Sequence, residues 1–223
     1  MTVPAGAEAV AEVRRRLARA AGRAGRPEDS VRLVAVTKGV DVGRITEVLG
    51  AGVRDLGESR AQELLAKVLD LSPYAPAWHF VGRLQRNKVP ALAPHVALWH
   101  SVDRAEAGEA IAHRQAGGRV LVEVNTSDEP QKGGCRPADA PALVDGLRAR
   151  GLSVEGLMTV PAPGCDPRPA FAALRELAGR LDLAELSMGM SDDFETAVEE
   201  GATMVRLGRA LFGPRPAPPG VQR

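Results

Sequence analysis

Short apolar runs alternate with longer amphipathic stretches over most of this chain. The runs are rich in Val and Leu and mostly lack strict polar alternation, which is typical of strands buried on both faces. Eight strands are predicted, over residues 31–37, 53–56, 78–81, 97–102, 119–125, 153–158, 184–187 and 203–207. The clearest helices predicted between them cover residues 42–50, 60–71, 104–115, 138–150, 168–181 and 192–200.

This alternation indicates parallel β/α units. At 223 residues, a single closed (β/α)8 TIM barrel fits better than an open sheet. A helix over residues 5–24 precedes the first strand, whereas little more than GRALFG follows the last. We expect this N-terminal helix to cover the barrel wall that a full eighth helix would cover. Residues 1–213 are predicted to form one domain, followed by a Pro-rich, disordered tail over 214–223.

The amino-acid composition argues against several classes of function. Lys and Arg number 29 against 28 Asp and Glu, so no global field favours nucleic acid or acidic lipid. Aromatic residues make up 3% of the chain, which disfavours a base-stacking surface. The two cysteines lack CxxC spacing and the four histidines lack HExxH spacing, so we expect no metal site.

The chain contains no apolar run long enough to span a membrane, and its N-terminal stretch reads as an amphipathic helix rather than a signal peptide. We therefore expect a cytoplasmic protein, a monomer without nucleic-acid or membrane partners.

Lys38 directly follows the first apolar run, VRLVAVT. In a (β/α)8 barrel this position faces the mouth, where active sites lie. Partial desolvation there favours the neutral amine, which is the form that condenses with an aldehyde. The alternative is an ordinary solvated lysine at the end of a strand.

A second signal lies after the seventh strand, in LSMGMSDD. Ser187 ends that strand, Gly189 lets the backbone approach a ligand closely, and Ser191 is a natural N-cap for the helix over 192–200. Barrels often hold a phosphate between the loops after strands seven and eight. Asp192 and Asp193 would oppose an anion placed directly over that helix.

The eighth strand contributes MVRLGRALFG, in which Gly208 opens a short helical turn. Arg206 and Arg209 add positive charge nearby. We expect a phosphate to bind the backbone amides of residues 187–191 and those at Gly208 and Arg209. The alternative is a capped helix and a structural glycine. An amine on strand one beside this phosphate cradle fits pyridoxal 5′-phosphate, which has an aldehyde and a phosphate.

Six segments carry a family resemblance, in order from about residue 31 to residue 213. They are VAVTKGV, DLGESRAQELLAK, WHFVGRLQRNK, VNTSDEPQKGG, GLMTVPAP and LSMGMSDDFETAVEEGATMVRLGRALFG. Together they resemble the pyridoxal phosphate homeostasis protein family, which is similar to the barrel domain of alanine racemase, a fold-type III protein, without its second domain.

The resemblance implies that Lys38 carries the cofactor as a Schiff base. It also implies that residues 187–191, with Met190 among them, and Arg206 to Gly208 bind the phosphate and ring. The family usually has Asn where this chain has Ser59 after Gly57-Glu58, and a hydroxyl replaces only part of an amide contact.

Other residues carry weaker signals. Asn125 and Met158 end strands five and six and are predicted to line the mouth, with simple packing the alternative for Met158. The segment with Arg83, Arg86 and Lys88 is either a solvated basic face or an anion or docking patch beside the pocket. His79 fits a core histidine with satisfied hydrogen bonds.

The leading hypothesis is a homeostasis protein that binds pyridoxal phosphate, buffers it and delivers it to client enzymes, without catalytic turnover. The first alternative is a racemase or decarboxylase of the same barrel class. A racemase needs acid/base groups on both faces of the cofactor, whereas the single tyrosine here, Tyr74, lies in a Pro-flanked loop and no second domain is expected. A barrel enzyme that binds a sugar phosphate through Lys38 is the second alternative.

Overall fold

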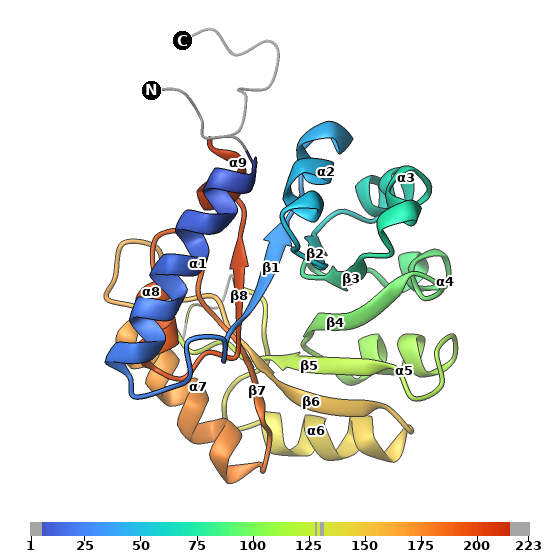
Figure 1. Ribbon diagram of the computed structural model, residues 1–223. Helices are drawn as coiled ribbons and strands as arrows, with labels where there is room; N and C mark the ends of the chain where they lie inside the picture. Colours follow the sequence, from blue (N-terminus) through green and yellow to red (C-terminus); the bar gives the residue numbers. More distant parts are fainter. Residues whose placement is uncertain (1–5, 128, 130–131, 215–223) are drawn as a thin grey trace, which may run out of the picture.

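The structure is a computed structural model that describes residues 6–127, 129 and 132–214. Eight parallel strands close into a barrel in sequence order, and the last strand pairs with the first (Figure 1). The predicted (β/α)8 TIM barrel is confirmed. Its strands are β1 Arg32–Val36, β2 Asp55–Glu58, β3 Ala77–Phe80, β4 Val96–Val102, β5 Arg119–Glu123, β6 Ser153–Met158, β7 Glu185–Ser187 and β8 Met204–Leu207.

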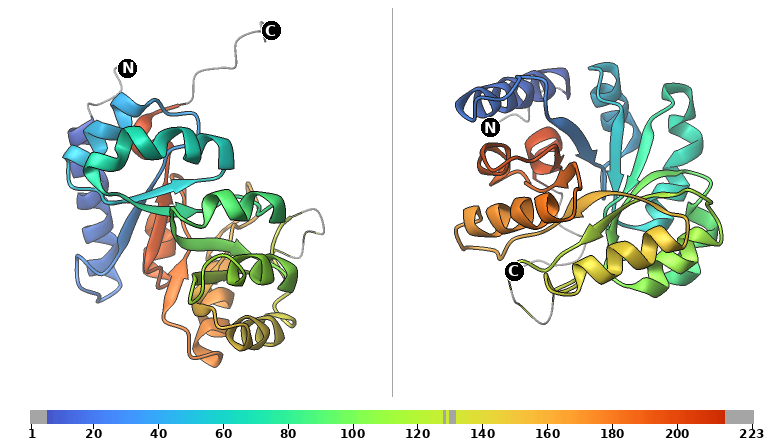
Figure 2. Two further views of the ribbon diagram at one scale, coloured as in Figure 1. Left: turned by 90° about the vertical axis from the view of Figure 1, so that its right-hand side faces the viewer. Right: turned by 90° about the horizontal axis from the view of Figure 1, so that it is seen from below.

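Helices surround the barrel on its outside (Figure 2). They are α1 Gly6–Arg23, α2 Val42–Gly50, α3 Ala61–Leu71, α4 Val89–Leu92, α5 Ala105–Ala112, α6 Ala140–Ala149, α7 Arg168–Arg180, α8 Phe194–Glu199 and α9 Arg209–Phe212, with 3-10 turns η1 Ser72–Tyr74 and η2 Arg86–Lys88. Within the described residues, no helix is long and apolar enough to cross a membrane.

The apolar core is divided by the barrel wall. A large cluster of buried side chains fills the layer between strands and helices. A second, small cluster consists of Leu98, Leu121, Met158 and Met204. The buried polar side chains His79, His100, Ser187 and Arg206 also lie on barrel strands. The barrel strands therefore bury polar as well as apolar side chains.

Two strands differ from the prediction by two residues, and the others by at most one. The second strand was predicted over 53–56 but is Asp55–Glu58, because the N–H of Val53 donates to Val48 O and closes the turn after α2. Strand β5 ends at Glu123 rather than at residue 125, because Val124 bridges Cys135 and the N–H of Asn125 donates to Cys135 O.

Helix α1 lies against α2, α8 and α9, and Figure 1 shows it beside α8 and α9. Only the four-residue α9 follows β8 within the described residues, so α1 covers the adjoining wall as expected. The short helix α4 and both 3-10 turns were not predicted. The predicted disordered tail lies, from residue 215 onward, outside the described residues.

Candidate functional site

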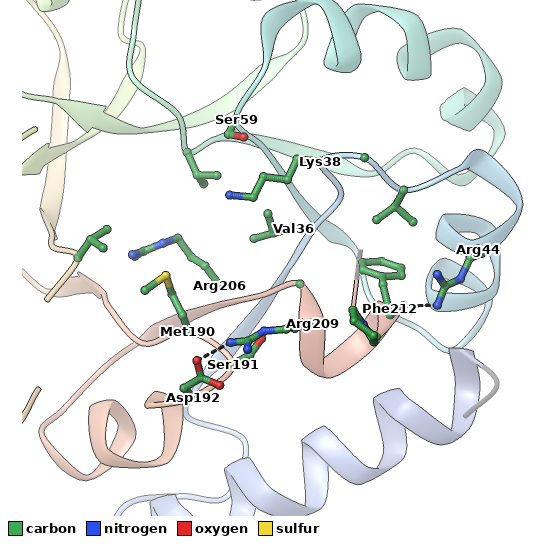
Figure 3. A pocket seen from close by; sticks show the side chains of 17 residues that line it. Val36, Lys38, Arg44, Ser59, Met190, Ser191, Asp192, Arg206, Arg209 and Phe212 are labelled. Carbon is green, nitrogen blue, oxygen red and sulfur yellow. Dashed lines mark hydrogen bonds and ion pairs between the residues drawn. The ribbon is translucent and has the colours of Figure 1, made fainter. Parts of the chain in front are cut away.

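A cleft of about 380 Å³ opens at the carboxyl ends of the strands, between segments that follow β1, β2, β7 and β8. Lys38 and Ser59 lie on one side, and Ser191, Asp192 and Arg209 on the other (Figure 3). Protein pockets for small ligands have volumes of roughly 300–1,000 Å³. The cleft is therefore large enough for one small ligand.

Basic side chains dominate the charge of this cleft. Among the described residues that line it, Lys38, Arg44, Arg206 and Arg209 are basic, whereas Asp192 is the one carboxylate. Opposite charges attract more strongly where water is partly excluded. The cleft therefore favours an anionic ligand.

Lys38 is held from both sides by a partly buried group that we name the Lys67 cluster, made of Thr37, Gly39, Glu58, Glu63 and Lys67. On the side before Lys38, the Lys67 ammonium donates to Thr37 O at 2.7 Å and to Glu58 Oε2 at 2.9 Å. The Thr37 hydroxyl also donates to Glu58 Oε2, at 2.9 Å. These bonds fix the backbone one residue before Lys38.

On the other side, the N–H of Gly39 donates to Glu63 Oε2 at 2.6 Å. Lys67 reaches the same oxygen at 3.1 Å. Burial acts to raise the pKa of Glu63, but hydrogen bonds from Gly39, Arg60 and Lys67 lower it to about 2. Glu63 therefore stays ionised at neutral pH, and the segment that carries Lys38 is anchored at both ends.

The Lys67 cluster was not predicted from the sequence. Glu63 and Lys67 are spaced i, i+4 in a predicted helix, which is the spacing of a helical ion pair. Glu58 ends β2 and is fully buried. The i, i+4 pair beside a carboxylate at a strand end was the available signal.

The opposite side of the cleft is built by the β7–α8 loop and α9. The Ser191 hydroxyl accepts from the N–H of Ala210, at 3.1 Å, and Arg209 forms an ion pair with Asp192. Gly208 lies at the N-cap of α9 and lines the cleft. These contacts join the β7–α8 loop to α9 at the edge of the cleft.

The expected capping role of Ser191 is wrong. Helix α8 begins at Phe194 with Asp193 at its N-cap, rather than at residue 192. Asp193 Oδ1 accepts from the N–H of Met190 at 2.6 Å and closes a turn before the helix. The Ser191 hydroxyl is consequently directed to α9 instead.

Arg206 projects from β8 and is 6% exposed. Its Nη1 donates to Ser187 O at 2.6 Å and Ser187 Oγ at 2.7 Å, and its Nη2 donates to Thr159 O at 2.9 Å. Burial lowers the pKa of Arg206 to about 10, against the opposing charges of Glu123 and Asp193. Arg206 therefore remains charged at neutral pH, and it lines the cleft with Lys38 (Figure 3).

The predicted site residues fall into two groups. The first group lines the cleft: Lys38, Ser59, Met190, Ser191, Arg206, Gly208 and Arg209. The second group lies outside the cleft lining. In this group, Ser187 is fully buried and accepts a hydrogen bond from Arg206, and Gly189 lies in the loop directly before Met190.

Asn125 and Met158 were predicted to line the barrel mouth, but neither lines this cleft. The Asn125 amide bonds within its own loop, donating to Glu129 O at 2.8 Å. Met158 is 2% exposed and packs in the small apolar cluster, which matches the packing alternative.

The basic segment after β3 also lies outside the cleft lining, and Arg83 and Arg86 are exposed. His79 is buried and bonds to Asp55 and His100, as expected of a satisfied core histidine. Among the described residues, no group of three or more His, Cys, Asp or Glu side chains could hold a metal ion.

The chain is similar to known proteins over most of its length. The family described as alanine racemase, N-terminal domain, matches residues 9–216. The Pyridoxal phosphate homeostasis protein of Pseudomonas aeruginosa is 42% identical over 219 residues, with 94% of this chain and 95% of that protein covered.

Two solved structures have the same fold over nearly their whole length. An unknown protein from Bifidobacterium adolescentis is 37% identical with a TM-score of 0.87, with 95% of this chain and 98% of that chain covered. PipY of Synechococcus elongatus PCC7942, with PLP bound, is 34% identical with a TM-score of 0.81, with 93% and 100% covered.

Proposed function

Because this chain belongs to the pyridoxal phosphate homeostasis protein family, we propose that it binds pyridoxal 5′-phosphate reversibly and helps control the free level of that cofactor. The observation that carries the proposal is the single cleft that unites Lys38, from the end of β1, with Ser191, Gly208 and Arg209, from the β7 and β8 ends. Release of the cofactor to client enzymes forms part of the same proposal.

Lys38 is the residue that we assign to covalent binding. Pyridoxal phosphate supplies an aldehyde, which condenses with a neutral amine to a Schiff base and releases one water molecule, and water reverses the reaction. The Lys67 cluster holds the backbone on both sides of Lys38, which favours one orientation of its side chain. An ordered amine in an open cleft supports exchangeable binding.

The other end of the cleft suits a phosphate. Arg209 supplies a cation, Ser191 a hydroxyl, and the start of α9 backbone amides. Arg206 uses three hydrogen bonds on protein oxygens, and a guanidinium has five N–H donors, so donors remain for a ligand. The charge and the hydrogen-bond donors of these residues therefore fit a phosphorylated aldehyde cofactor.

Absence of amino-acid turnover is the finer part of the proposal. The single tyrosine, Tyr74, lies in η1 before β3, hence toward the amino ends of the strands and away from the cleft. The Asp192 carboxylate, which does line the cleft, is bound to Arg209. These placements support a binding protein, because racemisation needs acid/base groups on both faces of the ligand.

Lys38→Ala tests the covalent assignment. We expect the loaded wild type to absorb in the visible range and the variant to lose this band. Borohydride should fix the cofactor mass on the Lys38 peptide, which is readily assigned because the chain has four lysines, Lys38, Lys67, Lys88 and Lys132. Lys88→Ala is the matched control and should label normally. Labelling of another lysine in the wild type would refute the assignment.

Turnover is tested by incubating the loaded protein with L-alanine and other amino acids in deuterated water. We expect spectral change without rapid loss of chirality or gain of α-deuterium. Turnover near a typical enzyme rate of about 10 per second would replace the homeostasis function with that of a racemase.

A further inference from the structure

A row of hydrogen bonds crosses the barrel interior from β2 to β8. We name Asp55, His79, His100 and Ser187 the histidine relay. Asp55 Oδ1 lies 3.0 Å from His79 Nε2, and His79 Nδ1 lies 2.8 Å from His100 Nε2. His100 Nδ1 lies 2.8 Å from Ser187 Oγ, which accepts from Arg206 at 2.7 Å.

The relay is buried except at its far end. His79 is 2% exposed, and both His100 and Ser187 are fully buried. The Asp55 side chain, at the start of β2, is 23% exposed. The relay therefore joins the partly exposed amino end of a strand to the cleft at the opposite end of the barrel.

The two ends determine the direction of every bond. Arg206 can only donate and an ionised Asp55 can only accept. With neutral rings, His79 donates from Nε2 to Asp55 and accepts at Nδ1, so His100 must donate from Nε2. His100 then accepts at Nδ1 from the Ser187 hydroxyl, whose oxygen accepts from Arg206. Each donor thus meets an acceptor when both rings carry their proton on Nε2.

A second proton on His79 would break this order. His79 Nδ1 would then donate to His100 Nε2, and His100 Nδ1 would donate to Ser187. The Ser187 oxygen would receive two donors, and its own proton would lose its relay acceptor. Burial, with the charges of Arg206 and Arg32 acting in the same direction, holds the pKa of His100 well below its usual value, which agrees with a neutral ring.

Arg206 depends on this arrangement for its placement. Among the described residues, no carboxylate forms an ion pair with it; its partners are two carbonyl oxygens and the Ser187 hydroxyl. A hydroxyl that itself donates to an imidazole is a stronger acceptor, because successive hydrogen bonds polarise one another. The relay therefore orients the guanidinium without neutralising its charge.

We propose that Asp55, His79, His100 and Ser187 are positioning residues that hold Arg206 in one orientation toward the ligand, with both imidazoles protonated on Nε2. The ligand part rests on the proposed binding of pyridoxal phosphate. The protonation pattern belongs to the cofactor-free protein and stands independently.

The first test is nitrogen-15 NMR of the imidazoles in the full-length, cofactor-free protein at neutral pH. We expect His79 and His100 each to show one protonated nitrogen, Nε2. His95 and His113 are exposed and serve as internal references for solvated rings. A doubly protonated ring, or an Nδ1–H tautomer at either buried position, would overturn the proposal.

The second test compares pyridoxal phosphate binding in three variants. Ser187→Ala removes the bond between relay and Arg206, and we expect affinity to fall about tenfold, as for loss of one hydrogen bond to a charged group. Asp55→Ala should weaken binding about two- to threefold, whereas Asp55→Asn keeps an acceptor for His79 and should restore it. The pH midpoint of the visible band should shift in Ser187→Ala and Asp55→Ala only.

Thr203→Ala is the matched control. The Thr203 hydroxyl accepts from the N–H of Leu186 at 2.8 Å and links β7 to β8, but it lies outside the relay. We expect lower stability with unchanged affinity and pH midpoint. Equal losses of affinity in Thr203→Ala and Ser187→Ala would refute positioning in favour of general loosening. If wild type forms no adduct with the cofactor, the proposed function fails, and the NMR result still decides the protonation pattern.

Discussion

At the scale of single residues, the site depends on side chains that lie far apart in the sequence. Lys38 follows β1, whereas Arg209 follows β8, and barrel closure makes these strands neighbours. Position after an apolar run was enough to single out Lys38. The Lys67 cluster was not predictable in the same way, because only the fold brings Glu58 and Lys67 to one side of Thr37.

Asp192→Asn tests the electrostatics of the cleft. Asp192 pairs with Arg209 and lines the cleft, so its charge competes with a phosphate for the guanidinium. Both side chains are largely exposed, so the effect is modest, and we expect about two- to fivefold tighter binding of pyridoxal phosphate. Binding of unphosphorylated pyridoxal should not change, and added salt should reduce the gain.

Equilibrium titrations of both ligands at two salt concentrations measure this difference. Glu176→Gln removes one negative charge from an exposed position on α7 and controls for net charge. An equal gain for pyridoxal and its phosphate ester would show that Asp192 does not face the phosphate.

At the scale of elements, continuous apolar runs predicted the strands, and the repeat of apolar positions in the stretches between them predicted the long helices. Their ends depended on specific hydrogen bonds instead, such as the Met190–Asp193 turn that delays α8. Short elements such as α4 bury too few residues to leave a periodic signal. The two imidazoles of the relay likewise lie on different strands, and only barrel closure joins them to Ser187.

Gly189→Ala tests the loop that carries Met190 and Ser191. Gly189 has φ +96°, and an added Cβ would lie 2.6 Å from Ala197 Cβ. We expect a loss of about 1–3 kcal/mol from backbone strain and a similar further loss from the steric clash. Urea unfolding of the cofactor-free protein measures the sum of the two losses as a lower free energy of unfolding.

Gly201→Ala is the matched control for that substitution. Gly201 has φ +102°, but its added Cβ would come closest to the flexible Arg175 side chain, at 3.3 Å, and would reach Leu186 only at an ordinary contact distance of 3.9 Å. It should therefore show the backbone cost alone. A loss in Gly201→Ala as large as in Gly189→Ala would show that the contact with α8 does not constrain the loop.

At the scale of the whole molecule, the N-terminal helix completes the barrel. Helix α1 buries Val10, Val13 and Leu17 at helical spacing against the remainder of the protein. Arg16 binds Glu195 through two hydrogen bonds, at 3.1 and 3.2 Å, and fastens α1 to α8. Because α1 also touches α9, the start of the chain supports the element that carries Arg209.

Leu17→Ala tests whether α1 is part of the cooperative unit. Leu17 is 4% exposed, so we expect its truncation to lower the free energy of unfolding by about 2–5 kcal/mol. Leu69→Ala, at a position 80% exposed on α3, should change it by less than about 0.5 kcal/mol. Comparable losses in the two variants would show that α1 is not packed as described.

Ligand addition separates support of the fold from support of the cleft. A ligand that binds only the folded state raises its stability by an amount set by concentration and affinity. Leu17 lies outside the cleft lining, so a saturating concentration of pyridoxal phosphate should raise the stability of wild type and Leu17→Ala equally. A smaller increase in the variant would mean that α1 shapes the cleft through α9. Parallel increases would place its role in closing the barrel wall.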